Sequence, residues 1–189
     1  MTEGAEVKNE QHVDAPEFII NLLHQIGTPA TLDDSFEGGI VSLEIDQNLV
    51  ESLSTWDKAQ KAYKSADGGT PSWIWGELKG IPYTKLDVSH LDVLVLNHKG
   101  TKPQERDKLV EDMDKAGYRP LEFPELIALG ILKPEYNKRN EILNTYKKYT
   151  LDGRLHVPCL FWSGDKRRLS ASRCGNEWDE RYRFLFVRK

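Results

Sequence analysis

The chain has 189 residues, of which 39% are hydrophobic and 30% charged, and its formal net charge is -4. This composition is typical of a globular protein with one sizeable domain. The slight acidic excess gives no general electrostatic attraction to nucleic acid or to an anionic membrane. No apolar run approaches the roughly 18 residues that a membrane-spanning helix needs. We therefore expect neither a nucleic-acid partner nor a membrane span.

The first half of the chain alternates between helix and strand patterns. Residues 1–13 are polar and lack periodicity, which predicts disorder. A capping residue and a proline in the first turn open an apolar pattern with helical spacing over residues 14–27. Alternation of apolar and polar residues over 39–46 predicts an amphipathic strand. The apolar stripe over 49–63 predicts one helix, which ends before Gly68-Gly69.

An aromatic segment follows, in which Trp73 and Trp75 flank Ile74 between prolines and glycines. Two neighbouring tryptophans suit a stacking platform for a sugar or a base. Tryptophan is highly buried on average, which favours the alternative that this segment covers one end of the core. Residues 92–97 then form a continuous apolar run that is typical of a buried strand.

The second half begins with two predicted helices. Residues 101–116 open with a capping pattern and end before a glycine, and residues 124–130 repeat an apolar helical pattern after a proline. Residues 133–150 are rich in Lys, Asn, Glu and Tyr, and they suggest either one more short amphipathic turn or an extended lid. Residues 151–154 are a turn signal that leads into the C-terminal stretch.

The last stretch, residues 157–189, combines strand patterns with many aromatic residues. Alternation places Val157, Cys159 and Phe161 on one face of a strand. Over the final run, one face carries aromatic side chains and the other carries aliphatic ones: Tyr182, Phe184 and Phe186 against Leu185 and Val187. A strand that is apolar on both faces is typical of the centre of a sheet. We therefore predict a mostly antiparallel sheet whose central strand ends the chain.

Patterns of catalytic residues are sparse. No glycine-rich loop has the spacing of a phosphate-binding motif. The five histidines lack the spacing of a zinc site. The two cysteines, Cys159 and Cys174, are too few for a disulfide scaffold. A disulfide between them, or a nucleophilic role for Cys174 beside Arg173, are the less favoured alternatives.

An acidic group near the C-terminus is a candidate for a calcium site. Glu177, Asp179 and Glu180 offer oxygen ligands of the kind that calcium prefers. Arg181 and Arg183 follow at once, so charge neutralisation within the loop explains the three carboxylates equally well. We predict no metal and no cofactor.

Several segments of the C-terminal half carry a resemblance to a known family. They are His156–Leu160, Lys166–Leu169 and Arg183–Lys189, together with the helix end Ala116–Pro120. On these segments the chain resembles the variable proteins that diversity-generating retroelements diversify, in particular those of the archaeal-virus and candidate-phylum type. The resemblance covers the C-terminal half only.

The resemblance implies an α+β fold of the C-type lectin-like class, akin to the formylglycine-generating-enzyme branch. Two helices would pack on a small twisted, mostly antiparallel sheet with a central C-terminal strand. We accordingly divide the chain into a disordered N-terminus (1–13), a part of unknown type that is integral to the fold or extends it (14–100), and a lectin-like core (101–189). The implied variable region is 157–182.

The implied function is ligand binding through a diversified, hypervariable surface that recognises a protein or another macromolecule. Because this family's diversification of asparagine-type codons cannot produce Glu, Lys or Trp, the resemblance implies that Lys166, Glu177 and Trp178 are scaffold. Leu169, Phe184 and Phe186 complete the predicted scaffold. Candidate ligand-binding positions point outward or lie in the loop: Phe161, Ser163, Ser170, Ser172, Cys174, Asn176, Asp179, Arg181 and Tyr182.

The chain also departs from relatives of that fold. It lacks the Glu-Pro-Asn loop and the Trp-Asn-Asp motif of calcium-dependent lectins, and their paired cysteines. We therefore expect neither calcium-dependent sugar binding nor catalysis. The alternatives are an enzyme of the formylglycine-generating-like branch that uses Cys159 or Cys174, and a structural or interaction module of a phage or cell surface that docks protein partners through Trp73–Trp75 and the C-terminal face. No signal peptide is recognisable, so we expect a cytoplasmic or virion-associated protein.

Overall fold

The structure is a computed structural model, which describes residues 21, 24, 30–32, 39–66, 72–98, 102–135 and 142–189. The predicted disorder of residues 1–13 lies outside these ranges, as does most of the helix predicted over 14–27. None of the helices in the described ranges combines the length and the apolar character needed to cross a membrane.

The fold is mixed α+β, and its strands join in one ten-stranded sheet within the described residues. In chain order the strands are β1 (Ala30–Leu32), β2 (Ile40–Glu44), β3 (Ser72–Ile74), β4 (His90–His98), β5 (Tyr118–Pro120), β6 (Ile142–Asn144), β7 (Tyr149–Leu151), β8 (Arg154–Ser163), β9 (Lys166–Arg173) and β10 (Tyr182–Arg188). The main path runs β1-β4-β10-β6-β8-β9-β3, with β2 beside β4, β5 beside β10 and β7 beside β8. Only β10–β6 and β3–β9 are parallel among these pairs, so the predicted antiparallel character is confirmed for the rest, although the sheet is larger than expected.

Strand β10 is central, as the sequence predicts. It pairs antiparallel with β4 from Arg183↔Asn97 to Val187↔Val93 and parallel with β6 on its other side. Its aromatic face, Phe184 and Phe186, lies in one hydrophobic cluster, and its aliphatic face lies in the other. Full burial of each such side chain contributes about 1.5–3 kcal/mol to the free energy of unfolding. Strand β10 therefore contributes side chains to both hydrophobic clusters, one on each face of the sheet.

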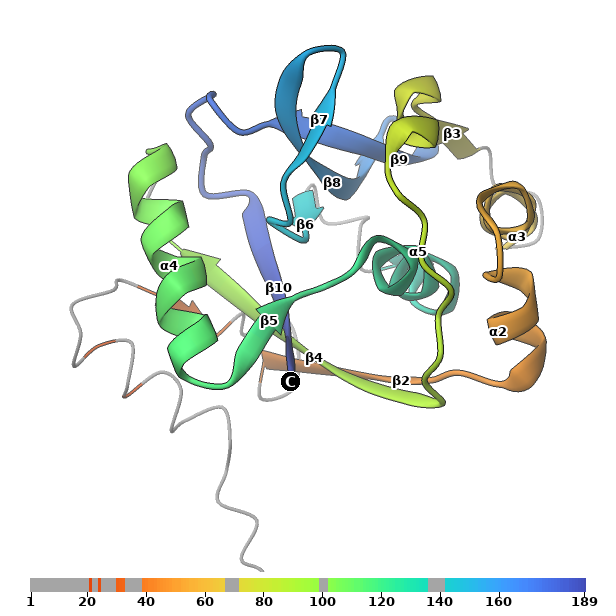
Figure 1. Cartoon of the computed structure of the whole chain (residues 1–189), viewed down its shortest axis with the longest axis horizontal. Helices are drawn as coiled ribbons and strands as arrows, with labels where there is room; N and C mark the ends of the chain where they lie inside the picture. The colour runs from red at the N-terminus through yellow and green to blue at the C-terminus, as the bar shows by residue number, and fades with distance from the viewer. Residues whose placement is uncertain are drawn as a thin grey trace, which may run out of the picture.

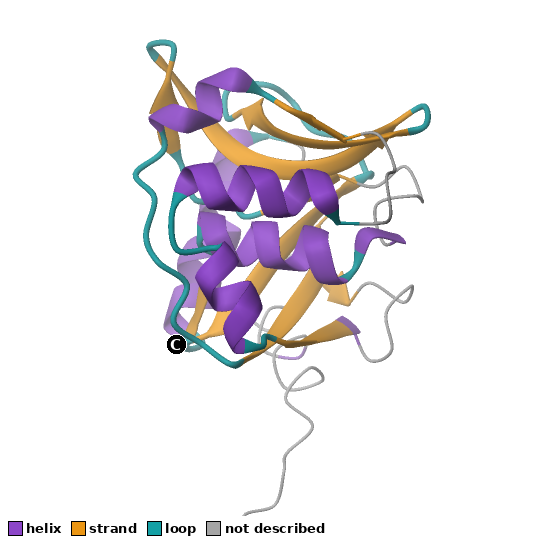
Figure 2. Cartoon of the chain, turned by 90° about the vertical axis from the view of Figure 1, so that its right-hand side faces the viewer, coloured by secondary structure: helices purple, strands orange, loops and turns teal. Residues whose placement is uncertain are grey.

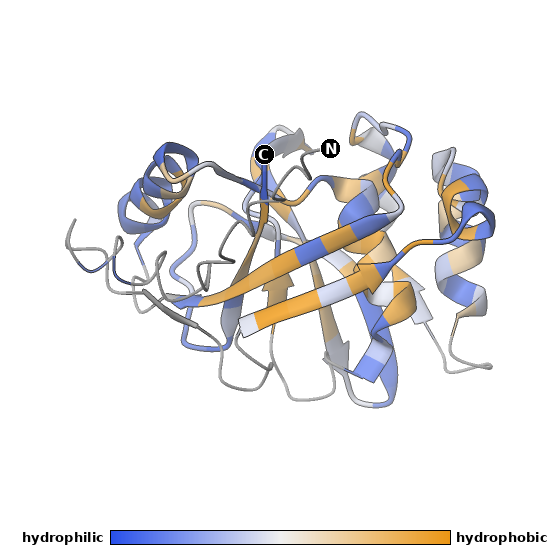
Figure 3. Cartoon of the chain, turned by 90° about the horizontal axis from the view of Figure 1, so that it is seen from below, coloured by the Kyte–Doolittle hydropathy of each residue, from blue (hydrophilic) through white to orange (hydrophobic). Residues whose placement is uncertain are grey.

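The helices cover the sheet on both sides of this strand (Figure 1). They are α2 (Gln47–Ser52), α3 (Trp56–Ser65), η2 (Gly76–Gly80, a 3-10 helix), α4 (Pro103–Lys115) and α5 (Phe123–Leu132). Figure 2 shows a layer of helices in front of the strands. Figure 3 shows the strands largely hydrophobic and α4 largely hydrophilic, as expected for a helix that buries one face only.

The helix predicted over 49–63 is two helices, which corrects the sequence prediction. Asp46 caps α2 by accepting from the Leu49 N–H at 2.7 Å, and Thr55 caps α3 by accepting from the Lys58 N–H. A second N-cap in the middle of an apolar stripe satisfies the free N–H groups of a new helix start. The stripe itself stays buried on both helices, through Val50 and Tyr63 among others.

The helices predicted over 101–116 and 124–130 are confirmed by α4 and α5, whereas the prediction for 133–150 is wrong over the described residues 142–150. Instead of a helical turn or a lid, this segment contains β6 and β7. Leu143 lies opposite Leu160 of β8, and the buried Asn144 amide donates to the Arg183 carbonyl at 2.6 Å. Tertiary pairing with strands on both sides outweighs the polar composition of the segment.

The boundary predicted between residues 100 and 101 does not separate two units. Strand β4 belongs to the N-terminal part and pairs along its length with β10. Arg167 of β9 is fully buried and donates to the carbonyls of Gly130 (3.0 Å), Tyr63 (2.7 Å) and Ala66 (2.9 Å). These bonds connect α3 of the N-terminal part to α5 and the C-terminal sheet, so the described residues of 14–100 are integral to the fold.

Candidate functional site

The surface of the described residues includes an aromatic and a charged hollow. The first, which we call the aromatic groove, has a volume of about 400 Å³ and is lined by Trp73, Trp75, Asp152, His156, Ser170, Ala171, Ser172, Arg173, Asn176, Glu177, Trp178 and Tyr182. The second, the charged cleft, has a volume of about 530 Å³ and is lined by Asp107, Val110, Glu111, Arg119, Pro120, Glu122, Tyr146, Lys147 and Lys148.

The aromatic groove draws its residues from distant parts of the sequence. Parallel pairing of β3 with β9 places Trp73 opposite Arg168 and carries the tryptophan segment to the C-terminal stretch. The turn between β7 and β8 contributes Asp152, and the loop between β9 and β10 contributes Asn176. The groove therefore depends on the sheet that joins the two halves of the chain.

Aromatic rings form the walls of the groove. Trp178 and Tyr182 stack with 4.5 Å between ring centroids and 12° between planes. Across the groove, the Trp75 and His156 rings lie 5.3 Å apart. Trp73 is 40% exposed, with the Arg168 guanidinium 5.1 Å from its ring centroid. Trp178 and His156 are buried, whereas Trp75 and Tyr182 are half-buried, so the exposed ring of Trp73 and the partly exposed rings of Trp75 and Tyr182 are the ones that offer contact area to a ligand.

A buried arginine, Arg106 of α4, supports the loop beneath these walls. Its Nη2 donates to the carbonyls of Cys174 (2.7 Å) and Asn176 (2.9 Å), and its guanidinium lies 4.1 Å from the Trp178 ring centroid. The Trp178 indole in turn donates to the Arg173 carbonyl at 3.2 Å. Backbone and ring are thus fixed together before any ligand binds.

Sequence analysis missed Arg106 because it stands among charged residues on an amphipathic helix. The one signal is its spacing: Arg106, Leu109 and Met113 recur three and four residues apart, so they lie on one helix face. Leu109 and Met113 are both fully buried, as is Arg106. An arginine in register with a buried stripe must find buried acceptors, because burying an unpaired charge is costly.

Several polar side chains of the groove have no partner among the described residues. Ser170, Arg173, Asn176 and Glu177 make no side-chain hydrogen bond or ion pair with any residue in the described ranges. The Asp152 carboxylate reaches the His156 ring only at 3.7 Å. The groove therefore presents a cation, a carboxylate, an amide and a hydroxyl between aromatic walls.

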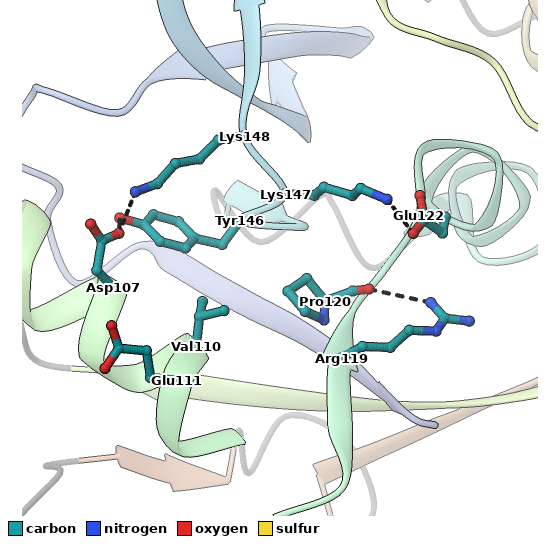
Figure 4. A pocket seen from close by; sticks show the side chains of 9 residues that line it. All are labelled: Asp107, Val110, Glu111, Arg119, Pro120, Glu122, Tyr146, Lys147 and Lys148. Carbon is teal, nitrogen blue, oxygen red and sulfur yellow. Dashed lines mark hydrogen bonds and ion pairs between the residues drawn. The ribbon is translucent and has the colours of Figure 1, made fainter. Parts of the chain in front are cut away.

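In the charged cleft, by contrast, two pairs of oppositely charged side chains bond to each other, Lys148 with Asp107 and Lys147 with Glu122 (Figure 4). Asp107 accepts from the Lys148 ammonium and from the Tyr146 hydroxyl, each at 2.6 Å. Lys147 is bonded to Glu122. Burial opposes ionisation of Asp107, but the hydrogen bonds from Lys148 and Tyr146 outweigh it and hold the pKa of this carboxyl below its usual range.

The structure brings together four of the nine predicted ligand-binding positions: Ser170, Ser172, Asn176 and Tyr182 line the groove. The others lie elsewhere. Phe161 is half-buried on β8, and Ser163 is exposed at the turn into β9. Asp179 and Arg181 are exposed and form an ion pair at 2.7 Å. Whether any of these positions binds a ligand stays a prediction.

The outward placement predicted for Cys174 is wrong. Its N–H donates to the Leu155 carbonyl at 3.0 Å, so residue 174 still follows the strand, and its side chain lies in the hydrophobic cluster of Trp178 and Phe184. Cys159 is buried as well, and both thiols are free. Burial raises the pKa of Cys159 to about 12 and also raises the pKa of Cys174.

The predicted core residues Leu169, Trp178, Phe184 and Phe186 are confirmed as buried. Glu177 and Lys166, which the resemblance assigned to the scaffold, are exposed, and Glu177 lines the groove.

The tryptophan segment is divided between the two roles considered for it. Ile74 and Trp75 pack against the main hydrophobic cluster, as the core interpretation predicts, whereas Trp73 is exposed. Sequence analysis also missed His156 and Ala171 as groove residues. Both stand in ordinary strand patterns, and they line the groove although His156 is buried and Ala171 half-buried.

No group of three or more His, Cys, Asp or Glu side chains in the described ranges is arranged to hold a metal ion. Comparison of the chain with models of known protein families, with curated proteins and with solved structures finds no match.

Proposed function

We propose that this protein binds a protein or another macromolecular ligand in the aromatic groove, and that the groove residues Ser170, Ser172, Asn176 and Tyr182 are replaceable positions on a C-type lectin-like scaffold. One observation carries the proposal. Residues selected from the sequence as diversified positions lie together in one hollow, between aromatic walls, and three of the four are small or amide side chains without a structural role in the core.

The arrangement of the C-terminal half supports the proposed scaffold. Helices α4 and α5 follow β4 in the chain, and β10, the last strand, pairs antiparallel with β4 at the centre of the sheet. This is the arrangement expected from the resemblance: two helices on a twisted sheet with a central C-terminal strand. The additional helices α2 and α3 belong to the N-terminal part.

Energetics support the separation of core from replaceable positions. Substitutions at exposed positions usually change the free energy of unfolding by less than about 0.5 kcal/mol. Deep core residues such as Leu169 and Phe184 cost several-fold more when truncated. A groove of open polar groups with rigid aromatic anchors can therefore change its chemistry while the fold stays constant.

The experiment is a pair of displayed libraries. One library randomises the four groove positions named above, and a matched library randomises four residues of the charged cleft, Asp107, Arg119, Glu122 and Lys147. Resistance to protease reports the folded fraction of each library. We expect the groove library to stay largely folded apart from members that lose the stack of Tyr182 on Trp178, and the cleft library to lose more of its members, because each of its four side chains is in an ion pair: Lys147 with Glu122, Asp107 with Lys148 and Arg119 with Glu125.

Both libraries are then selected against lysozyme as a model protein target. The proposal predicts that binders come from the groove library. Equal loss of folded members in the two libraries, or no groove binders, would contradict it.

Diversification itself has a genetic test. The proposal predicts a reverse-transcriptase gene near the coding sequence, together with a near-duplicate of its 3′ end that differs mainly at adenines. If sequencing of the neighbourhood finds neither, the retroelement part of the proposal is wrong, and ligand binding in the groove would have to stand on the library experiment alone.

A further inference from the structure

The aromatic groove opens onto the edge of a strand. Ser170, Ala171, Ser172 and Arg173 are consecutive residues of β9, and all four line the groove. Because successive side chains of a strand point to opposite faces of the sheet, a hollow that touches all four must extend around the edge of the strand.

Two backbone hydrogen bonds fix which groups point to that edge. The Cys174 N–H donates to Leu155 of β8, whereas the Leu169 carbonyl accepts from the Trp75 N–H on the opposite side, each at 3.0 Å. In an antiparallel pair, successive residues direct their backbone groups alternately toward the partner strand and away from it. Ala171 lies two residues after Leu169, so its N–H and C=O point away from β8, as does the Arg173 N–H.

Strand β3 does not reach these groups. Its pairing with β9 ends at Ile74↔Leu169. The next carbonyl along β3, that of Trp75, accepts instead from the Leu78 N–H at 3.2 Å and begins η2. Beyond Ala171, the Arg173 carbonyl is occupied by the Trp178 indole. Among the described residues, no hydrogen bond is made to the Ala171 backbone groups from the open side.

On this basis, and resting on the proposed function, we propose that the ligand of the groove is an extended peptide segment of a partner protein, which adds to the open edge of β9 in line with β3. Ala171 and the Arg173 N–H supply the main-chain hydrogen bonds, as in other cases of strand addition. Alternate side chains of the peptide then lie on either side of the edge, against Trp73 and Tyr182 on one side and Trp75 on the other.

The charges beside the edge suit a peptide that carries both signs. Arg173 and Glu177 are exposed and make no ion pair with described residues, and Asp152 lies near His156, the residue of β8 that stands opposite Arg173. A peptide offers donors and acceptors along its whole backbone, which a rigid sugar or a flat base does not. Open strand edges are natural templates for another chain.

The probe is a phage-displayed library of random heptapeptides, selected on the whole protein. Selected peptides are synthesised with their normal backbone and with alternate amides N-methylated. They are tested on the wild-type protein, on Ala171→Pro, which lacks the outward N–H, and on Ala171→Val, which keeps it. Proline is tolerated where a strand's N–H faces an open edge, and hydrogen exchange checks that each variant is folded.

If the peptide adds as a strand, its affinity for Ala171→Pro should be at least about tenfold weaker than for the wild type, because one backbone hydrogen bond is lost and the adjacent one is misaligned. Its affinity for Ala171→Val should stay within about threefold of that for the wild type. N-methylation should weaken binding to the wild type similarly, and the bound peptide should protect the Ala171 and Arg173 amides from exchange. The N-methylated peptides keep the test decisive even if Ala171→Pro fails to fold.

A third variant, Tyr182→Ala, separates this inference from the proposed function. If peptides lose binding to Tyr182→Ala but are indifferent to Ala171→Pro and to N-methylation, the groove binds ligand and strand addition is wrong. If no peptide is selected while the groove library of the previous section yields binders to lysozyme, strand addition is again wrong. Dimerisation of the protein that Ala171→Pro abolishes would assign the edge to a second copy of this chain and overturn the proposal.

Discussion

The aromatic groove and the charged cleft lie on one fold and even share a helix, yet their polar groups have opposite arrangements. Neighbouring residues of α4 serve the two hollows, with Arg106 beneath the groove and Asp107 in the cleft. In the cleft, oppositely charged side chains pair across the opening. In the groove, Arg106 and the Arg173 carbonyl hold the loop and Trp178, and the side chains of Ser170, Arg173, Asn176 and Glu177 make no bond with described residues.

This difference teaches which hollow is suited to change. A side chain whose charge is paired within the protein cannot be replaced without leaving its partner unpaired. A side chain that makes no such pair can be replaced while the backbone beneath it stays in place. We propose on this basis that the cleft is a structural surface and the groove a replaceable one, and the following changes test that distinction.

The largest effect is expected for Arg106→Leu. It leaves the carbonyls of Cys174 and Asn176 without their donor and removes the cation beneath Trp178, so we expect the free energy of unfolding to fall by about 3 kcal/mol. Chemical denaturation measures the loss. The matched control is Arg173→Leu, an exposed groove arginine, with an expected change below about 0.5 kcal/mol. An equal loss of stability in Arg106→Leu and Arg173→Leu would contradict the distinction between a supporting arginine beneath the groove and an unpaired arginine on its surface.

Arg119→Met should have the next largest effect. Arg119 donates two hydrogen bonds, at 2.8 and 2.7 Å, to Glu125, whose side chain is only 4% exposed. Removing the guanidinium leaves a buried carboxylate unpaired, at a cost of about 2 kcal/mol given that Arg119 itself is partly exposed. Adding Glu125→Gln should restore about half of the loss, because the amide oxygen still accepts from the Glu122 N–H. A double variant no better than the single one would contradict this account.

Tyr182→Ala tests the groove wall. The ring stacks on Trp178 and is half-buried, so its removal should cost about 1–2 kcal/mol of stability by denaturation and change the tryptophan fluorescence. Tyr182→Phe keeps the stack and loses only the 3.5 Å contact with the Ser172 hydroxyl, so its stability should stay within about 0.5 kcal/mol of wild type. An equally large effect of Tyr182→Phe would show that the hydroxyl, not the ring, forms this wall.

The smallest effect is expected for Lys148→Met in the cleft, about 0.5 kcal/mol at neutral pH. Because folding lowers the pKa of Asp107, the stabilisation is complete above its unfolded pKa of about 3.9 and is lost as the pH falls through the folded pKa. The difference between wild type and Lys148→Met should therefore shrink in acid. Lys166→Met, at an exposed lysine of β9, is the control and should show no such pH dependence.

Local patterns predict the elements of this protein better than its site. The central position of β10 follows from its two apolar faces, and α4 and α5 follow from caps and periodicity. Strand β6 could not be predicted from its own polar segment, because it forms by pairing with β10 and β8. Three groove positions follow from alternation along β9 and β10 and a fourth, Asn176, from its place in the loop between them, whereas Cys174 stays in the register of β9 and its side chain is buried.

The support of the groove could not be predicted, because it rests on contacts between residues far apart in the chain. Arg106 reaches a loop some 70 positions later, and Trp73 reaches β9 through a parallel pairing that no short pattern signals. The open edge at Ala171 depends on the Trp75 carbonyl turning to Leu78, which is a consequence of packing around η2.

The most direct measurement uses the indole N–H resonances of the five tryptophans in a groove-library variant selected to bind lysozyme. Three of them, Trp73, Trp75 and Trp178, line the groove, whereas Trp56 packs on Phe123 and Trp162 donates to the Pro134 carbonyl elsewhere. On addition of lysozyme, the three groove resonances should shift or broaden and those of Trp56 and Trp162 should not. Perturbation of Trp56 and Trp162 with unchanged groove resonances would contradict the central claim that the aromatic groove is the binding site.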